Sequence, residues 1–213
     1  AFKAQWPGGG EVQGKGYFAI MLFTGMVVHG FFAECLTRSP GVIVGNTSYV
    51  KKVVFPIEVL PVVAVGSALF HSLISLSVLL VGVLALRQSL PATALLVPLV
   101  LLPLVLLAQG VTWLLAALGV YLRDIAHSTG LLAVVLSFIS PVFYPTSTLP
   151  APYSQWIYLN PLTWVMETTR AVLVHGNPPH WGQWLLALSA SALACWLGYW
   201  SFQKARSGFA DVL

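Results

Sequence analysis

The amino-acid sequence predicts an all-α membrane protein with five visible transmembrane helices and a sixth expected in the intact chain. Three observations carry this prediction: 58% of the residues are hydrophobic, only 8% are charged, and several apolar runs are as long as a bilayer is thick. A soluble domain has about a quarter charged residues, so this chain cannot cover a water-facing surface. Its expected solvent is the bilayer, where helices satisfy their own backbone hydrogen bonds.

The predicted spans follow one another with two longer connections between them. A helix needs about 20 apolar residues to cross a bilayer. The apolar runs predicted to span the membrane are residues 17–36, 59–86, 91–122, 126–143 and 184–202. The third run is long enough to tilt, with Pro98 and Pro103 as expected kinks. Residues 1–16 form a predicted outer loop, so the chain reads as a single transmembrane domain.

The first longer connection, residues 39–55, predicts a short helix lying in the membrane interface. Tyr49 and the neighbouring valines fall on one helical face, while Lys51 and Lys52 turn toward the headgroups. Pro56 ends the helix, because proline removes a backbone donor.

The second longer connection, residues 145–181, predicts a helical hairpin that enters the membrane and returns to the same side. Each of its two apolar pieces is too short to span. Between them Asn160 is a capping residue and Pro161 a first helical residue. Glu167 and Arg170 are three residues apart, close enough to pair on a helix. The pair is either a clamp between hairpin and spans or a contact to substrate.

Nothing in the chain predicts covalent chemistry or a metal site. The metalloprotease pattern His-Glu-x-x-His and the hydrolase pattern Gly-x-Ser-x-Gly are both missing. The acidic residues near the spans, Glu34, Glu58 and Asp124, lack the spacing of an acid–base pair. His29 and His71 each stand alone on an apolar helix, where packing is the simpler role. The two cysteines fall in apolar runs and predict free buried thiols.

A charged pair, Arg123 and Asp124, interrupts the apolar sequence between the third and fourth spans. It predicts either a plain polar turn or a cytoplasmic gate, since ionised side chains reach water there. The fourth run then ends at Pro141 and Pro145, where helical hydrogen bonds are lost. Backbone groups freed within a membrane need protein or water partners, so the break predicts a pore lining.

Counting basic residues favours a cytoplasmic C-terminus. In that orientation the basic residues inside are Arg38, Lys51, Lys52, Arg123, Lys204 and Arg206. Those outside are Lys3, Lys15, Arg87 and Arg170. One further span upstream would place both ends inside.

Four stretches carry a resemblance to a known family. They are NTSYVKKVVFPIEVLP at 46–61, YLRDI at 121–125 with SPVFYP at 140–145, LNPLTWVMETTRAVL at 159–173 and the tail GFADVL at 208–213. In this order they resemble the membrane subunit of type-2 ABC exporters, in the branch that moves lipid-linked polysaccharides such as O-antigen, capsule or teichoic acid. In that family an amphipathic helix and a first span precede the loop with which this sequence begins, so both are expected outside it.

The resemblance implies a homodimeric permease in the bacterial cytoplasmic (inner) membrane that exports such a polysaccharide. A separate ABC ATPase would bind ATP and magnesium, and this chain would hold no cofactor and do no enzymatic chemistry itself. Membrane lipid is a further expected partner, and nucleic acid is not. The implied ATPase-coupling residues are Asn46, Tyr49, Lys51, Lys52, Phe55, Pro56 and Glu58.

A polysaccharide path should present aromatic rings, on which the C–H faces of sugars stack. The residues expected along the path and at its outer mouth are Tyr144, Tyr153, Trp156, Tyr158, Trp164, Glu167 and Arg170. An interfacial aromatic belt is the alternative role for the rings. A drug or lipid efflux permease, an intramembrane glycosyl- or phosphate-transferring enzyme and an ATP-independent channel are the alternative functions.

Overall fold

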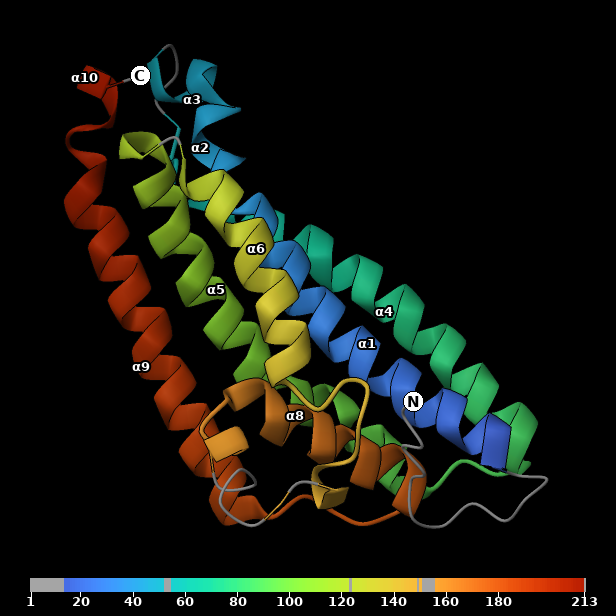
Figure 1. Cartoon of the computed structure of the whole chain (residues 1–213). Coiled ribbons are helices and arrows are strands. Elements are labelled where there is room, and N and C mark those ends of the chain that lie inside the picture. Colours follow the sequence, from blue (N-terminus) through green and yellow to red (C-terminus); the bar gives the residue numbers. More distant parts are fainter. Residues whose placement is uncertain (1–13, 52–54, 123, 149, 151–155, 213) are drawn as a thin grey trace. The chain divides into compact units, whose positions relative to one another are not determined.

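A computed structural model describes residues 14–51, 55–122, 124–148, 150 and 156–212. Within these residues the chain is helical and contains no strand, which confirms the all-α prediction (Figure 1). The long helices are α1 (Gly14–Arg38), α4 (Val59–Arg87), α5 (Val97–Tyr121), α6 (Ile125–Ile139) and α9 (Trp181–Arg206).

Four helical stretches of the described chain are long and apolar enough to cross a membrane. They are Gly16–Arg38, Val59–Arg87, Ala92–Tyr121 and Trp181–Arg206. The third joins a 3₁₀ turn, η1 (Ala92–Leu96), to α5, and Pro103 lies inside that helix. The fourth predicted run is helical over only 15 residues, about 22 Å at 1.5 Å per residue. It ends at Ile139 because Pro141 follows, so α6 is shorter than the predicted span.

The single interfacial helix predicted over 39–55 is divided in two. Its parts are α2 (Gly41–Val44) and α3 (Thr47–Lys51). Gly45, a poor helix former, ends α2. The Asn46 side chain then donates from Nδ2 to the Val42 carbonyl at 2.8 Å, a local bond that competes with helix continuation. Residues 52–54 lie outside the described chain.

The chain forms two compact units, and each of the five long helices contributes residues to both. Unit 1 consists of residues 1–30, 72–102 and 135–184. It contains α8 (Pro161–Arg170) and a π-helical turn, η3 (Ala171–His175). Its buried core comes from α1, α4, α5 and η3: Ile20, Met21, Val27, Leu76, Leu79, Val83, Val97, Val100, Val172, Leu173 and Val174.

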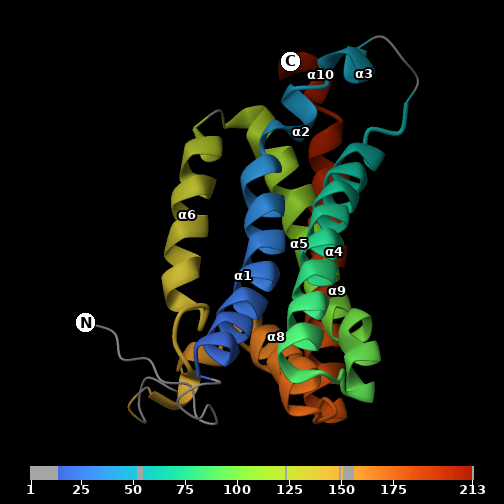
Figure 2. The ribbon, with the colours of Figure 1, turned by 90° about the vertical axis from the view of Figure 1, so that its right-hand side faces the viewer.

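Unit 2 consists of residues 31–71, 103–134 and 185–213. In both ribbon views α2, α3 and the C-terminal α10 (Phe209–Val212) lie at the same end of it (Figures 1 and 2). Its core is Ile43, Ile57, Ala116, Ala117, Val120, Phe202 and Phe209. The backbones of α5 and α9 meet at two glycines, since a Cβ on Gly198 would lie 2.1 Å from the Gly110 carbonyl oxygen. Such close approach of helices is typical of membrane packing.

Candidate functional site

The helix α8 begins where the sequence predicts, at a capped asparagine. Asn160 Oδ1 accepts a hydrogen bond from the Leu162 amide at 3.0 Å, and Pro161 occupies the first helical position. The same side chain donates from Nδ2 to Ser140 Oγ at 2.8 Å. The start of α8 is therefore tied to the residue that follows α6.

The helix ends at Arg170, whose side chain is only 1% exposed. Nη1 donates to Glu167 Oε1 at 2.9 Å, so the pair expected from the spacing is present. Nε donates to the Met21 carbonyl at 3.1 Å, and Nη2 to the Val142 carbonyl at 3.3 Å. One buried guanidinium thus joins α8 to α1 and to the turn after α6, and we call this set the Arg170 clamp.

A glycine on α1 makes room for the Arg170 clamp. A Cβ placed on Gly25 would lie 2.6 Å from Arg170 Nη2 and 3.2 Å from Val142 Cα. The guanidinium could shift, but the Val142 backbone is held within its turn. A larger residue at position 25 would therefore force Arg170 away from its acceptors.

The π-helical turn η3 follows the clamp directly. Its wide turn leaves carbonyls without the usual helical donors, and other segments supply replacements. Arg87 Nη1 donates to the Val174 carbonyl, and Thr93 Oγ1 donates to the Val172 carbonyl at 2.7 Å. The end of α4 and the η1 turn are thereby bonded to the same segment as α8.

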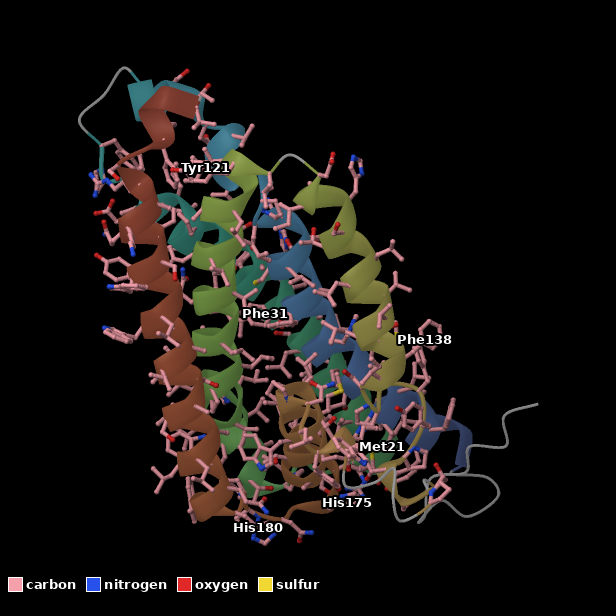
Figure 3. The ribbon with its side chains drawn as sticks, turned by 60° about the vertical axis from the view of Figure 1, so that its left-hand side comes forward. Met21, Phe31, Tyr121, Phe138, His175 and His180 are labelled. Carbon is pink, nitrogen blue, oxygen red and sulfur yellow. The ribbon has the colours of Figure 1, made fainter. Side chains whose placement is uncertain are left out.

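The last residue of η3, His175, lies with Met21 at the α8 end of the unit (Figure 3). Its Nε2 is 3.0 Å from the Tyr17 hydroxyl. The side chain is exposed, but partial desolvation of its ring and the nearby positive charge of Arg87 lower the pKa of His175, while Glu167 opposes them. The folded protein therefore disfavours the protonated imidazole relative to a free histidine.

The burial of Arg170 bears on its two predicted roles. A side chain that is 1% exposed cannot reach a substrate in this conformation, so the geometry favours the role of a clamp. Glu167 is 29% exposed and still reaches the surface.

Of the described aromatic residues predicted at the outer mouth, two are hydrogen-bonded to protein acceptors and two are exposed. The Tyr144 hydroxyl donates to the Phe138 carbonyl at 3.0 Å, and Trp164 Nε1 donates to Gln183 Oε1 at 3.3 Å. Trp156 and Tyr158 are exposed. Tyr153 lies outside the described residues.

The coupling residues that can be placed lie in unit 2 and form two contacts. The rings of Tyr49 and Phe55 are 5.1 Å apart, and Pro56 beside them is exposed. Glu58 is held from two sides: Trp113 Nε1 donates to its carbonyl at 3.1 Å, and Arg206 Nη1 lies 3.0 Å from its Oε2. Of the two lysines, Lys51 is placed in α3 by its backbone alone, and Lys52 is not described.

The predicted gate or turn is described only at Asp124, which is exposed just before α6; Arg123 is not described. Tyr121 lies at the end of the preceding helix and points toward the C-terminal segment (Figure 3). Its hydroxyl donates to the Ala205 carbonyl at 2.8 Å, and its ring contacts Phe209.

Three side-chain contacts of unit 2 were not predicted from the sequence: Glu34 with Arg38, Glu34 with His71, and Glu58 with Arg206. Glu34 is paired both with Arg38 on its own helix and with His71 on α4. Its four-residue spacing from Arg38 is a signal that could have been used. Nothing local joins Glu34 to His71 or Glu58 to Arg206, because these contacts depend on how the helices pack. Both cysteines are free, and Cys35 is buried while Cys195 is partly buried.

Comparison with known proteins identifies the family. The family model described as ABC-2 type transporter matches residues 4–174. The chain belongs to this family. It is 29% identical over 199 residues to the O-antigen export system permease protein RfbA of Myxococcus xanthus, an alignment that covers 92% of this chain and 76% of that protein. It is 24% identical over 198 residues to a Klebsiella pneumoniae protein of the same name, with the same shares covered.

The family and the four spanning helices together make this chain a multi-pass membrane protein and a permease subunit of an ABC transporter. The resemblance drawn from the sequence motifs is thereby confirmed at the level of the family. The tail 208–213 lies beyond the matched region.

Proposed function

We propose that this chain is the permease subunit of an ATP-driven exporter that moves a lipid-linked polysaccharide, such as O-antigen or capsule, across the bacterial cytoplasmic membrane. The observation that carries the proposal is the alignment with O-antigen export permeases over 92% of the chain. The sequence motifs support the same branch.

The proposed complex contains two copies of this chain and a cognate ABC ATPase, which binds ATP and magnesium. The C-terminus and the α2–α3 segment would face the cytoplasm and the ATPase. The coupling contacts are assigned to Asn46, Tyr49, Lys51, Lys52, Phe55, Pro56 and Glu58. Arg123 and Asp124 would form the turn or gate on the same side.

The contacts of Glu58 support this assignment. If the ATPase displaces the coupling segment, that segment must contact the helices whose movement it transmits. Glu58 stands immediately before α4 and is bonded to Trp113 on α5 and Arg206 on α9. A displacement of α2–α3 would therefore reach three long helices through one residue.

In unit 1 we assign glycan contact to exposed rings. The exposed rings of Trp156 and Tyr158 can stack on sugar. The Tyr144 hydroxyl and Trp164 Nε1, in contrast, already donate hydrogen bonds to protein acceptors. Glu167 would offer a hydrogen-bond acceptor beside them, and Arg170 would hold α8 in place.

Deletion of the gene, followed by cell fractionation, tests the substrate. We expect lipid-linked glycan to accumulate on the cytoplasmic side and to be missing from the cell surface. Complementation with W156A should restore less surface glycan than W196A, which removes an exposed ring from α9 and serves as the matched control. Normal surface glycan in the deletion strain would remove the polysaccharide assignment and favour drug or lipid efflux by the same family.

Charge reversal tests the ATPase partner separately. The double variant K51E/K52E should lose co-purification with the ATPase, and K15E, a reversal at a lysine predicted to lie on the outer side, should keep it. Intact co-purification and transport in K51E/K52E would contradict the placement of the coupling contacts.

A further inference from the structure

An ionisable cluster lies on two membrane-spanning helices of unit 2 and shares no residue with the coupling contacts. Glu34 Oε1 accepts from Arg38 Nη1 at 2.7 Å and lies 2.9 Å from His71 Nδ1. Ser67 Oγ on α4 is 3.5 Å from the same Arg38 nitrogen. We call these four residues the α1–α4 cluster.

The cluster is not closed off by protein. The side chains of Arg38 and His71 are 50% and 55% exposed, on helices that are otherwise apolar. A guanidinium has five N–H donors. Within the described part of the chain, Arg38 uses only Nη1, toward Glu34 and Ser67. Its Nε and Nη2 therefore point to whatever surrounds the helices.

The position of Arg38 at the end of α1 indicates what surrounds its guanidinium. Arg38 is the last residue of α1, and Glu34 precedes it by one turn, about 6 Å along the axis at 1.5 Å per residue. The last turn of a spanning helix lies where hydrocarbon meets the headgroups, and long basic side chains reach the phosphates there.

The neighbouring face of α4 suits an acyl chain. Val63 and Phe70 are exposed; Ser67 lies between them in the helix, and His71 directly follows Phe70. Gly66, between Val63 and Phe70, is open, since a Cβ there would meet no atom within 4 Å. An apolar strip beside the half-exposed guanidinium of Arg38 matches a phospholipid in both charge and polarity.

We propose that the α1–α4 cluster binds the phosphate headgroup of an anionic membrane phospholipid, with Arg38 as the principal donor and the Val63–Phe70 face as the surface for its acyl chain. Basic sites between transmembrane helices recognise anionic headgroups in this way. Glu34 competes with the phosphate for Arg38 and limits the affinity. The proposal concerns a bound lipid, not the exported cargo, and does not depend on the proposed function.

Native mass spectrometry of the purified full chain in detergent tests the proposal. Dioleoyl phosphatidylglycerol and dioleoyl phosphatidylcholine are titrated separately, and the dissociation constant of the first bound lipid is compared. Wild type should prefer phosphatidylglycerol, and R38Q should weaken that binding about fivefold, the effect of one basic residue near a lipid headgroup. E34Q should tighten it, because the competing carboxylate is lost.

K204Q is the matched control, since Lys204 is another exposed cation near the end of a spanning helix. It should leave the preference unchanged. If R38Q does not fold, E34Q/R38Q removes both charges together and should still lose the preference. Electrophoresis in native detergent reports on the oligomeric state of each variant.

Four results would overturn the proposal. One is equal affinity of wild type for the two lipids, and another is an equal loss in R38Q and K204Q, which would indicate general attraction to charge. A third is displacement of the lipid by inorganic phosphate at the same concentration, which would make the site one for free anions. The fourth is dissociation of a dimer in R38Q with no change in lipid binding, which would assign the cluster to contact with a second copy.

Discussion

Replacing Arg170 with methionine should destabilise the fold more than a surface substitution can. Methionine fills most of the volume of the buried side chain but donates no hydrogen bond. The substitution leaves Glu167 without its cation and removes one donor each from the Met21 and Val142 carbonyls.

The size of the loss follows from the burial of the two charges. Removing one partner of a buried ion pair costs about 3–5 kcal/mol, because the remaining charge is left uncompensated. Glu167 is 29% exposed and can regain water, so the lower end applies, about 3 kcal/mol. The double variant E167Q/R170M leaves no unpaired charge and should lose less, about 2 kcal/mol, because the Met21 and Val142 carbonyls still lose their donor.

Gly25 offers an independent route to the same clamp. G25A places a methyl group 2.6 Å from Arg170 Nη2, and overpacking of this kind costs about 1–3 kcal/mol. In G25A/R170M the guanidinium is no longer there to be displaced. The double variant should therefore be less destabilised than the sum of the single variants, as expected for residues in direct contact.

The assay is unfolding of the purified chain in mixed micelles by increasing dodecyl sulfate, followed by tryptophan fluorescence. The free energies of unfolding are compared with wild type. A loss below about 1 kcal/mol in R170M, the range of exposed ion pairs, would refute the clamp. Strict additivity of G25A and R170M would refute the contact between them.

Two further predictions use the same assay. G198A should destabilise the chain, because its Cβ would lie 2.1 Å from the Gly110 carbonyl oxygen, whereas G182A meets no atom within 4 Å and should be neutral or stabilising; equal effects would contradict the close helix approach. Because the pKa of His175 is lowered in the folded state, unfolding takes up a proton, so its stabilising contribution is full above its unfolded pKa and is lost as pH falls through the lowered value. H175Q should flatten the loss of stability below about pH 6.5; a wild-type slope in H175Q would contradict this reasoning.

Several features were determined by local sequence. The apolar runs fixed which segments become long helices, because length and hydropathy depend on the segment alone. Asn160-Pro161 set the start of α8, and the spacing of Glu167 and Arg170 set their pairing, since caps and helical pairs act within one turn. The end of α6 at Ile139 agrees with the break predicted at Pro141, because proline cannot continue a helix.

What the sequence could not determine is how these elements meet. That Arg170 is buried against Met21 depends on helix packing, and so does the need for glycine at position 25. The pairing of Glu34 with His71 joins residues 37 positions apart, and that of Glu58 with Arg206 joins residues 148 apart. The helical periodicity of the sequence cannot predict contacts between residues so far apart. These polar side chains have their partners on other helices, which only the tertiary structure brings together. An ionic group in an apolar helix is stable only where another segment supplies a counter-charge or a polar surface.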